Sequence, residues 1–186
     1  MVMPAFVPRY TAREIRGFPD ARVRYEVIRG ELFVTPAPGL RHQEAVLELA
    51  LRLREYVDRY AIGRVVIAPF EVELTEDSAV QPDVLVILAD RAGRLTPKRL
   101  EGPPSLAVEV ISYTSKRTDR LQKRRLYQEE NVPEYWIVDV DARRIERWTP
   151  GVDAAEVLTE RLVWRPEPTA PALEIDLGAL FARIWR

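Results

Sequence analysis

The chain has 186 residues, 47% of them hydrophobic, and a formal net charge of −1 at pH 7. This length is enough for one well-buried core, so we expect a single domain over residues 1–186. The near-neutral charge argues against a protein that coats nucleic acid through bulk positive charge, although a local basic patch is compatible with it. The absence of cysteine excludes disulfides, thiolate metal ligands and thiol nucleophiles, so any metal must be held by oxygen and at most one imidazole, that of His42.

Two further features bear on where the protein works. No run of about 18 apolar residues is available to span a bilayer, and the N-terminal segment lacks the charged, then apolar, then small-residue pattern of an export signal. We therefore expect a soluble, cytoplasmic protein. Lysine contributes only three of the 28 basic residues, and the chain has 15 prolines. Asn occurs once and Met twice. Scarce thermolabile residues and plentiful prolines are typical of a thermophile, although a GC-rich genome also selects Arg, Ala and Pro codons, and we treat a thermophilic source as a hypothesis.

The first third of the chain predicts a short helix, a hairpin and a long helix. Residues 11–16 favour a helix, and alternating runs at 23–28 and 31–35 flank a glycine turn, a pattern typical of a β-hairpin. Between residues 41 and 60, apolar side chains recur every three or four positions, which is helical spacing. We expect this long helix to end at Gly63.

The middle of the chain predicts strands around a second helix. The expected order is strands at 64–74, 81–88 and 104–112, a helix at 115–130 and a strand at 134–140. With the long helix before them, these elements give helix, three strands, helix, strand. That order predicts an α/β chain of the α+β kind, with a mixed sheet and helices packed against it. Residues 143–149 and a run near 157–164 predict a final hairpin.

Two carboxylates lie inside neighbouring apolar runs. Asp83 begins one run, and the alternation of the other places Glu109 on the face opposite its larger aliphatic side chains. A buried carboxylate costs several kcal/mol unless a cation or a donor compensates it, so the two groups point to a shared partner. If their strands are neighbours, both can converge on an ion that prefers oxygen ligands, such as Mg²⁺. The alternative is structural: Asp83 caps a turn and Glu109 reaches an arginine.

The helix after Glu109 carries polar residues four positions apart. Asp119, Lys123 and Tyr127 share one stripe, and Lys116 lies one turn earlier. An acid four residues before a lysine is also an ordinary helix-stabilising pair, worth about 0.2–0.5 kcal/mol. Lys123 stands out because lysine is rare in this chain. The arginines of the same helix can contact phosphates or simply form a solvated basic face.

These residues resemble a known family. The segments YEVIRGEL, RHQEAV, VQPDVLVI and LAVEVIS, and the spacing D-x-x-x-K-x-x-x-Y before VPEYWIVD, are similar to the Uma-two family of endonucleases, a branch of the PD-(D/E)XK restriction-endonuclease-like superfamily. The similarity covers roughly residues 25–139, and EIDLGALF resembles the usual ending of the family. It implies a restriction-endonuclease-like core with an N-terminal hairpin and a C-terminal β extension.

The resemblance also implies a metal centre. Asp83 and Glu109 would ligate Mg²⁺ or Mn²⁺, with the backbone carbonyl of Val110 as a further ligand. The chain departs from the superfamily pattern because Ile111 occupies the position of the motif lysine. Lys123, on the following helix, is then the substitute that would orient or activate the attacking water and stabilise the developing negative charge.

Five residues are weaker candidates for supporting roles. Lys116 is the second choice for the displaced lysine, and Asp119 lies on the same helix. His42 resembles the histidine of the family and would contact a phosphate or a metal-bound water, although a histidine at a helix start is commonly structural. Glu71 would support the metal indirectly or line the cleft, unless it is an exposed strand carboxylate. Glu31, after the hairpin glycine, is the weakest candidate.

The leading hypothesis is a metal-dependent endonuclease that hydrolyses DNA phosphodiester bonds with metal-activated water. One alternative is a non-catalytic interaction or assembly protein that keeps a nuclease fold, and another is hydrolysis of a smaller phosphate ester. No glycine-rich nucleotide loop occurs, which argues against an ATP-driven enzyme. DNA is the expected partner, and the apolar C-terminal segment can supply an interface for a homodimer or a higher oligomer.

Overall fold

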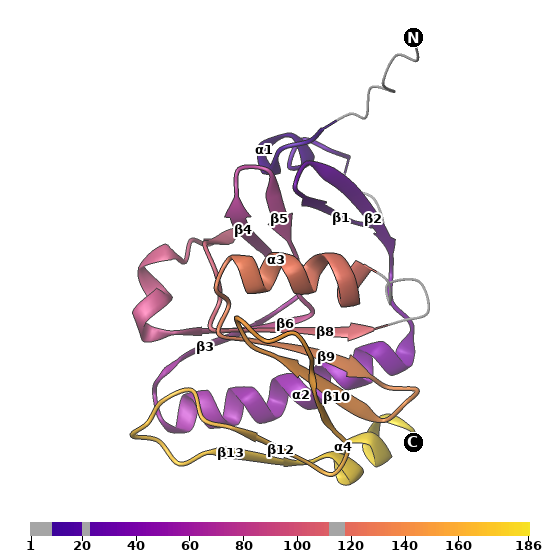
Figure 1. Ribbon diagram of the computed structural model, residues 1–186, viewed down its shortest axis with the longest axis vertical. Coiled ribbons are helices and arrows are strands. Elements are labelled where there is room, and N and C mark those ends of the chain that lie inside the picture. The colour runs from indigo at the N-terminus through magenta and orange to yellow at the C-terminus, as the bar shows by residue number, and fades with distance from the viewer. Residues whose placement is uncertain (1–8, 20–22, 112–117) are drawn as a thin grey trace.

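The protein folds into layers of sheets and helices (Figure 1). The computed structural model describes residues 9–19, 23–111 and 118–186, with residues 118–120 described by their backbone alone. The helical elements are α1 (Ala12–Ile15), α2 (Leu40–Arg59), the 3-10 helix η1 (Ala89–Arg94), the π-helix η2 (Thr118–Lys123), α3 (Arg124–Glu129) and α4 (Leu177–Ile184). The strands are β1 (Val23–Ile28), β2 (Glu31–Pro36), β3 (Gly63–Ile67), β4 (Glu71–Thr75), β5 (Ser78–Val80), β6 (Val84–Leu88), β7 (Arg99–Glu101), β8 (Leu106–Ile111), β9 (Glu134–Asp139), β10 (Arg144–Trp148), β11 (Glu156–Leu158), β12 (Arg161–Trp164) and β13 (Leu173–Asp176).

A six-stranded sheet forms the centre of the molecule, with the strand order β11-β10-β9-β8-β6-β3. β8 and β9 run parallel, and the other neighbours run antiparallel. α2 lies along one face of this sheet. α3 lies on the other face, between the central sheet and the five-stranded sheet β2-β1-β5-β4-β7 (Figure 1). The β12–β13 pair and α4 pack on the α2 side.

Two apolar clusters cover the two faces of the central sheet. On the α2 side, Val108 and Val110 pack with α2 and α4. On the α3 side, Leu85 and Ala107 pack with α3 and with the five-stranded sheet. Successive strand residues point to opposite faces, and both faces of β6 and β8 are buried and apolar, with Glu109 of β8 as the one polar residue. The side chain of Glu109 lies on the α3 side, as the predicted alternation requires.

The predicted order of the core is confirmed. α2, β3, β6, β8, α3 and β9 give the expected helix, three strands, helix and strand, and their sheet is mixed. The N-terminal hairpin is also confirmed, because β1 pairs with β2 across Arg29 and Gly30. The φ angles of these two residues are 52° and 81°, as a tight two-residue hairpin turn requires. The long helix differs from its predicted bounds by one residue at each end.

Two boundaries near the start of the core differ from the prediction. The strand expected at 64–74 is interrupted at Pro69, which has no N–H to donate, so β3 joins the central sheet and β4 joins the five-stranded sheet. Gly63 does not end the long helix. The chain leaves the helix at Ala61, with a φ of 52°, and Gly63 begins β3. A Cβ at Gly63 would lie 2.8 Å from the Cα of Leu88, because β3 and β6 approach closely there.

The expected C-terminal hairpin is confirmed only for the first part of its second run. β10 pairs with β11, whereas β12 pairs with β13 in a separate two-stranded sheet. The run at 157–164 is therefore divided between two sheets by the bend at residues 159–160. The short strands β5 and β7 had no sequence signal strong enough to predict them.

α2 is the longest helix, and its apolar face is turned to the central sheet. Its other face carries exposed charged side chains, including the ion-paired Arg54 and Asp58. Within the described residues, no helix has both the length and the apolar character needed to cross a membrane.

Candidate active site

Asp83 and Glu109 lie opposite each other at one end of the central sheet. β6 begins at Val84, which pairs with Val108 of β8, so the same register extended by one residue sets Asp83 opposite Glu109. Both residues are buried, with 2% of their surface exposed. Oδ2 of Asp83 accepts a hydrogen bond of 2.9 Å from the backbone N–H of Val110. Just before β6 begins, this carboxylate thus takes the place of a backbone partner for the Val110 N–H.

Two basic side chains hold the other oxygen of Asp83. Nη2 of Arg24, from β1, lies 3.0 Å from Oδ1, and Nε2 of His42, from the first turn of α2, lies 3.2 Å from it. Burial by itself would raise the pKa of the Asp83 carboxyl, but the contacts with His42, Arg24 and the Val110 N–H outweigh burial and lower this pKa below 3.8. Burial likewise opposes the charge on Arg24, and the surrounding carboxylates, Asp83 first among them, outweigh it and raise the pKa of Arg24.

Lys123 joins two buried carboxylates. Its Nζ atom lies 2.8 Å from Oε1 of Glu109 and 2.8 Å from Oε1 of Glu26, a residue of β1. The hydroxyl of Tyr127, one helical turn later, donates to Oε1 of Glu109 at 3.3 Å. Glu26 also accepts a hydrogen bond of 2.7 Å from the backbone N–H of Gln81. Because the lysine and both carboxylates are almost completely buried, each charge depends on these partners.

These contacts, together with the electrostatic interaction of Arg24 with Glu26 and Glu109, define one charged cluster drawn from five parts of the chain. Its members are Arg24, Glu26, His42, Asp83, Glu109 and Lys123. Among the described residues, the cluster holds three carboxylates against two fixed cations and one imidazole.

Sequence reasoning missed Arg24 and Glu26. They alternate along β1 with apolar residues, and the polar face of such a strand is ordinarily exposed to solvent. In this fold η2 and α3 lie over that face, so Glu26 is buried against Lys123 (Figure 1). The signal in the sequence was the family-like segment YEVIRGEL, which contains both Glu26 and the candidate Glu31.

The structure brings some of the predicted site residues together and leaves others apart. Asp83 contacts Val110 and His42, and Lys123 contacts Glu109, at neighbouring positions of β6 and β8. The roles of these residues in chemistry remain predictions.

Two accessory candidates lie outside the cluster. Glu71, on β4 of the five-stranded sheet, pairs with Arg16 at 2.6 Å, and its supporting role stays a prediction. Glu31 lies at the start of β2 and lines a separate pocket. Lys116 and the side chain of Asp119 fall outside the described residues.

The donor chemistry of the cluster fits a hard divalent cation. Carboxylate and carbonyl oxygens are the ligands that Mg²⁺ and Mn²⁺ prefer. In an antiparallel pair, the N–H and C=O of one residue face the same edge of the strand, so the Val110 carbonyl is directed to the same side as its N–H, which contacts Asp83. Nδ1 of His42 is buried and has no hydrogen-bond partner among the described residues, as expected beside a site that takes up water or a ligand.

The types of donor atom suit a divalent cation, but the donors are not arranged as a complete metal site. Within the described residues, no three His, Asp or Glu side chains converge as a ready set of metal ligands. Both oxygens of Asp83 already accept hydrogen bonds or ion pairs. An ion bound here would therefore share the Asp83 carboxylate with Arg24 or displace the guanidinium.

Residues 10–178 match the family model described as "Uma2: Putative restriction endonuclease". The chain belongs to the Uma2 family. The match extends from before β1 to the start of α4 and includes all six members of the charged cluster. The family resemblance seen in the sequence is confirmed.

A solved structure shares the fold of this Uma2 protein. It is the crystal structure of "a putative nuclease belonging to DUF820" from Anabaena variabilis ATCC 29413, with a TM-score of 0.79. The two chains are 18% identical, and the match covers 94% of this chain and 99% of that chain. At this identity the likeness establishes the fold alone, and it confirms the mixed α+β architecture. A search among curated proteins gave no match.

Proposed function

We propose that this Uma2 protein is a divalent-metal-dependent endonuclease that hydrolyses phosphodiester bonds of DNA. The observation that carries the proposal is the meeting of Asp83, Glu109 and Lys123, from three separate segments, in one buried cluster. Buried ionisable groups that depend on one another are found most often at functional sites. Membership of a family described as restriction endonucleases supports the reaction class.

The carboxylates would provide the metal site. Asp83, Glu109 and the Val110 carbonyl would hold Mg²⁺ or Mn²⁺. When bound, the ion would supply a Lewis acid that lowers the pKa of water and offsets the charge of the phosphodiester. Lys123 would place a fixed positive charge beside the scissile phosphate, where negative charge develops in the transition state.

The remaining members of the cluster would position these groups. Glu26 holds the Lys123 ammonium against Glu109, so the lysine needs little reorganisation when the phosphate binds. His42 and Arg24 keep Asp83 ionised, as its lowered pKa indicates. An ionised carboxylate is the form that ligates a cation.

The alternative, a non-catalytic protein that keeps the fold, is favoured by one observation. Both oxygens of Asp83 and Oε1 of Glu109 have protein partners. A fully paired network of this kind also rigidifies a core without any chemistry. The two proposals differ in whether the carboxylates bind an ion.

Cleavage of DNA by purified protein tests the proposed function. Supercoiled plasmid and circular single-stranded DNA would be incubated with the protein and Mg²⁺ or Mn²⁺, with EDTA as the blank. We expect cleavage by the unaltered chain and a loss of about 100-fold or more in Asp83→Asn and Glu109→Gln, the scale seen when one electrostatic contact to the transition state is removed. Asp58→Asn is the matched control, because Asp58 is an exposed carboxylate of α2 paired with Arg54. Cleavage that persists in Asp83→Asn, or no cleavage with either metal, would refute the proposal.

A further inference from the structure

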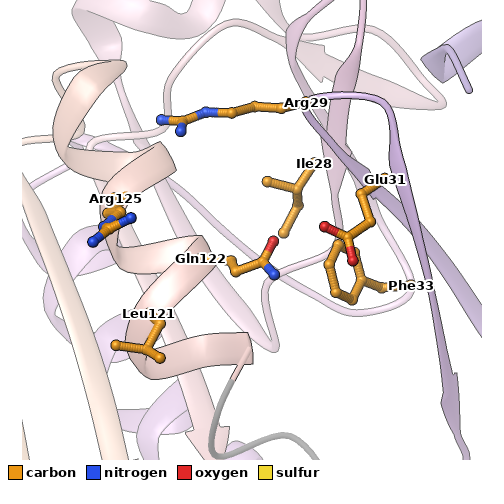
Figure 2. A pocket seen from close by; sticks show the side chains of 7 residues that line it. All are labelled: Ile28, Arg29, Glu31, Phe33, Leu121, Gln122 and Arg125. Atoms are coloured by element: carbon orange, nitrogen blue, oxygen red, sulfur yellow. The ribbon is translucent and has the colours of Figure 1, made fainter. Parts of the chain in front are cut away.

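A pocket of about 620 Å³ lies between the β1–β2 hairpin and the helical segment formed by η2 and α3. Small ligands are typically bound in pockets of roughly 300–1,000 Å³. Its walls include Ile28 and Phe33 from the hairpin and Gln122 from η2, as Figure 2 shows. None of these residues belongs to the charged cluster.

The register of the hairpin joins this pocket to the charged cluster. Phe33 of β2 pairs with Glu26 of β1, and Glu31 pairs with Ile28. Paired residues of antiparallel strands share one face, so Phe33 and Ile28 face the same side as Glu26, whose carboxylate holds Lys123. The pocket therefore begins directly beside the Glu26–Lys123 ion pair.

Successive residues on this face of β1 lead from the cluster to the pocket. Arg24 contacts Asp83, Glu26 contacts Lys123, and Ile28 lines the pocket. Alternate residues of a strand are about 7 Å apart, so Ile28 lies one such step beyond Glu26. A DNA strand that binds with one phosphate at the charged cluster would thus bring a neighbouring base to the pocket.

The lining combines the kinds of group that bind unpaired nucleotides. Phe33 and Ile28 form an apolar wall, and the Gln122 amide reaches from the helix toward them (Figure 2). Arg29 and Arg125 are exposed at the rim, where Arg29 also pairs with Glu129. Aromatic rings stack on bases, amides hydrogen-bond base edges, and guanidinium groups attract phosphates.

We propose that this pocket receives an unpaired nucleobase adjacent to the phosphate held at the charged cluster. The inference rests on the proposed nuclease function and narrows its substrate to DNA that is single-stranded, or that exposes an unpaired base, at the cleavage position. A paired base in a duplex cannot offer its face to Phe33, because that face is stacked on its neighbours.

Binding measured without metal tests the pocket separately from cleavage. Fluorescence anisotropy in EDTA would give the dissociation constants of a labelled oligonucleotide as a single strand and as a blunt duplex, at one salt concentration. We expect the single strand to bind about tenfold more tightly than the duplex, and Phe33→Leu to weaken single-strand binding by about tenfold, within the range for loss of one base–aromatic stack. Gln122→Ala should weaken it by about threefold.

Phe70→Leu is the matched control, since Phe70 is a partly buried ring on the same apolar cluster as Phe33 but does not line the pocket. We expect it to bind as the unaltered chain does. Circular dichroism would verify the fold of each variant, and if Phe33→Leu fails to fold, Gln122→Ala decides the outcome. Equal binding of strand and duplex, unchanged binding in Phe33→Leu and Gln122→Ala, or an equal loss in Phe70→Leu would each overturn the proposal.

The same samples separate this inference from the nuclease function. Asp83→Asn should lose cleavage and keep the preference for single strands. If the unaltered chain cleaves DNA and Phe33→Leu binds normally, the pocket assignment fails and the nuclease function stands. If no cleavage occurs while the preference depends on Phe33, the nuclease function fails and the pocket remains as a nucleobase site.

Discussion

Nζ of Lys123 lies 2.8 Å from Oε1 of Glu109, although the two residues belong to different elements, η2 and β8. The same atom lies 2.8 Å from Oε1 of Glu26, and all three residues are almost completely buried. Lys123→Met would leave two buried carboxylates without this cation. We expect it to lower the free energy of unfolding by about 3–5 kcal/mol, measured by denaturant titration at pH 7.

Lys98→Met is the control for this prediction, because Lys98 is an exposed lysine. A surface change of this kind should alter the free energy of unfolding by no more than about 0.5 kcal/mol. Equal effects of the two substitutions would mean that Lys123 does not stabilise the carboxylates in solution.

Acid should weaken the fold through Asp83. Burial opposes ionisation of this carboxyl, but His42, Arg24 and the Val110 N–H lower its pKa below the ordinary 3.8. The ionised carboxylate therefore stabilises the fold fully when the pH is above the pKa of Asp83 in the unfolded chain. This stabilisation is lost as the pH falls through the pKa of Asp83 in the folded chain. We expect the difference in unfolding free energy between the unaltered chain and Asp83→Asn to shrink as the pH falls below about 5. A difference that stays constant down to the acid limit of folding would contradict this assignment.

The contact between β3 and β6 at Gly63 should tolerate no side chain. A Cβ there would lie 2.8 Å from the Cα of Leu88, and neither backbone can move without breaking the strand pairing. We expect Gly63→Ala to lower the midpoint of thermal unfolding by roughly 10 °C or more, corresponding to a loss of a few kcal/mol. Gly93→Ala is the control, because a Cβ at Gly93 meets no atom within 4 Å. Similar midpoints for the two variants would show that β3 is displaced from this position.

Much of the central fold could be predicted because its signals are local. The three- and four-residue spacing of apolar side chains predicted α2. The alternation along β8 predicted that Glu109 points to the other face of the sheet from Val108 and Val110. The prolines and glycines near these runs marked most of the ends. A mixed sheet followed from the order of the elements alone.

The division of the strands between sheets could not be predicted from local patterns. β3 and β4 are adjacent in sequence but pair in different sheets, and β12 pairs with β13 instead of completing the hairpin of β10. These choices depend on which distant strand offers a free edge. Glu71 was a candidate through its resemblance to an acidic position of the family, with an exposed strand carboxylate as the alternative, and no local pattern indicated its pairing with Arg16.

Only part of the candidate site could be predicted, because local patterns do not show which distant elements pack together. Asp83 and Glu109 stood out as carboxylates in apolar runs, and Lys123 stood out by its rarity. Arg24 and Glu26 did not, because an alternating strand gives no sign that a helix will cover its polar face. Their burial became visible only when η2 and β1 were placed against each other.

Calorimetric titration with Mn²⁺ tests the central claim most directly, because it asks whether the charged cluster binds an ion at all. We expect the unaltered chain to bind Mn²⁺ with measurable heat, Asp83→Asn and Glu109→Gln to lose this binding, and Glu71→Gln to retain it, since Glu71 pairs with Arg16 outside the cluster. If the unaltered chain binds no Mn²⁺, or if Glu109→Gln binds it as well as the unaltered chain does, the cluster is a structural ion-pair network and not a metal-dependent active site.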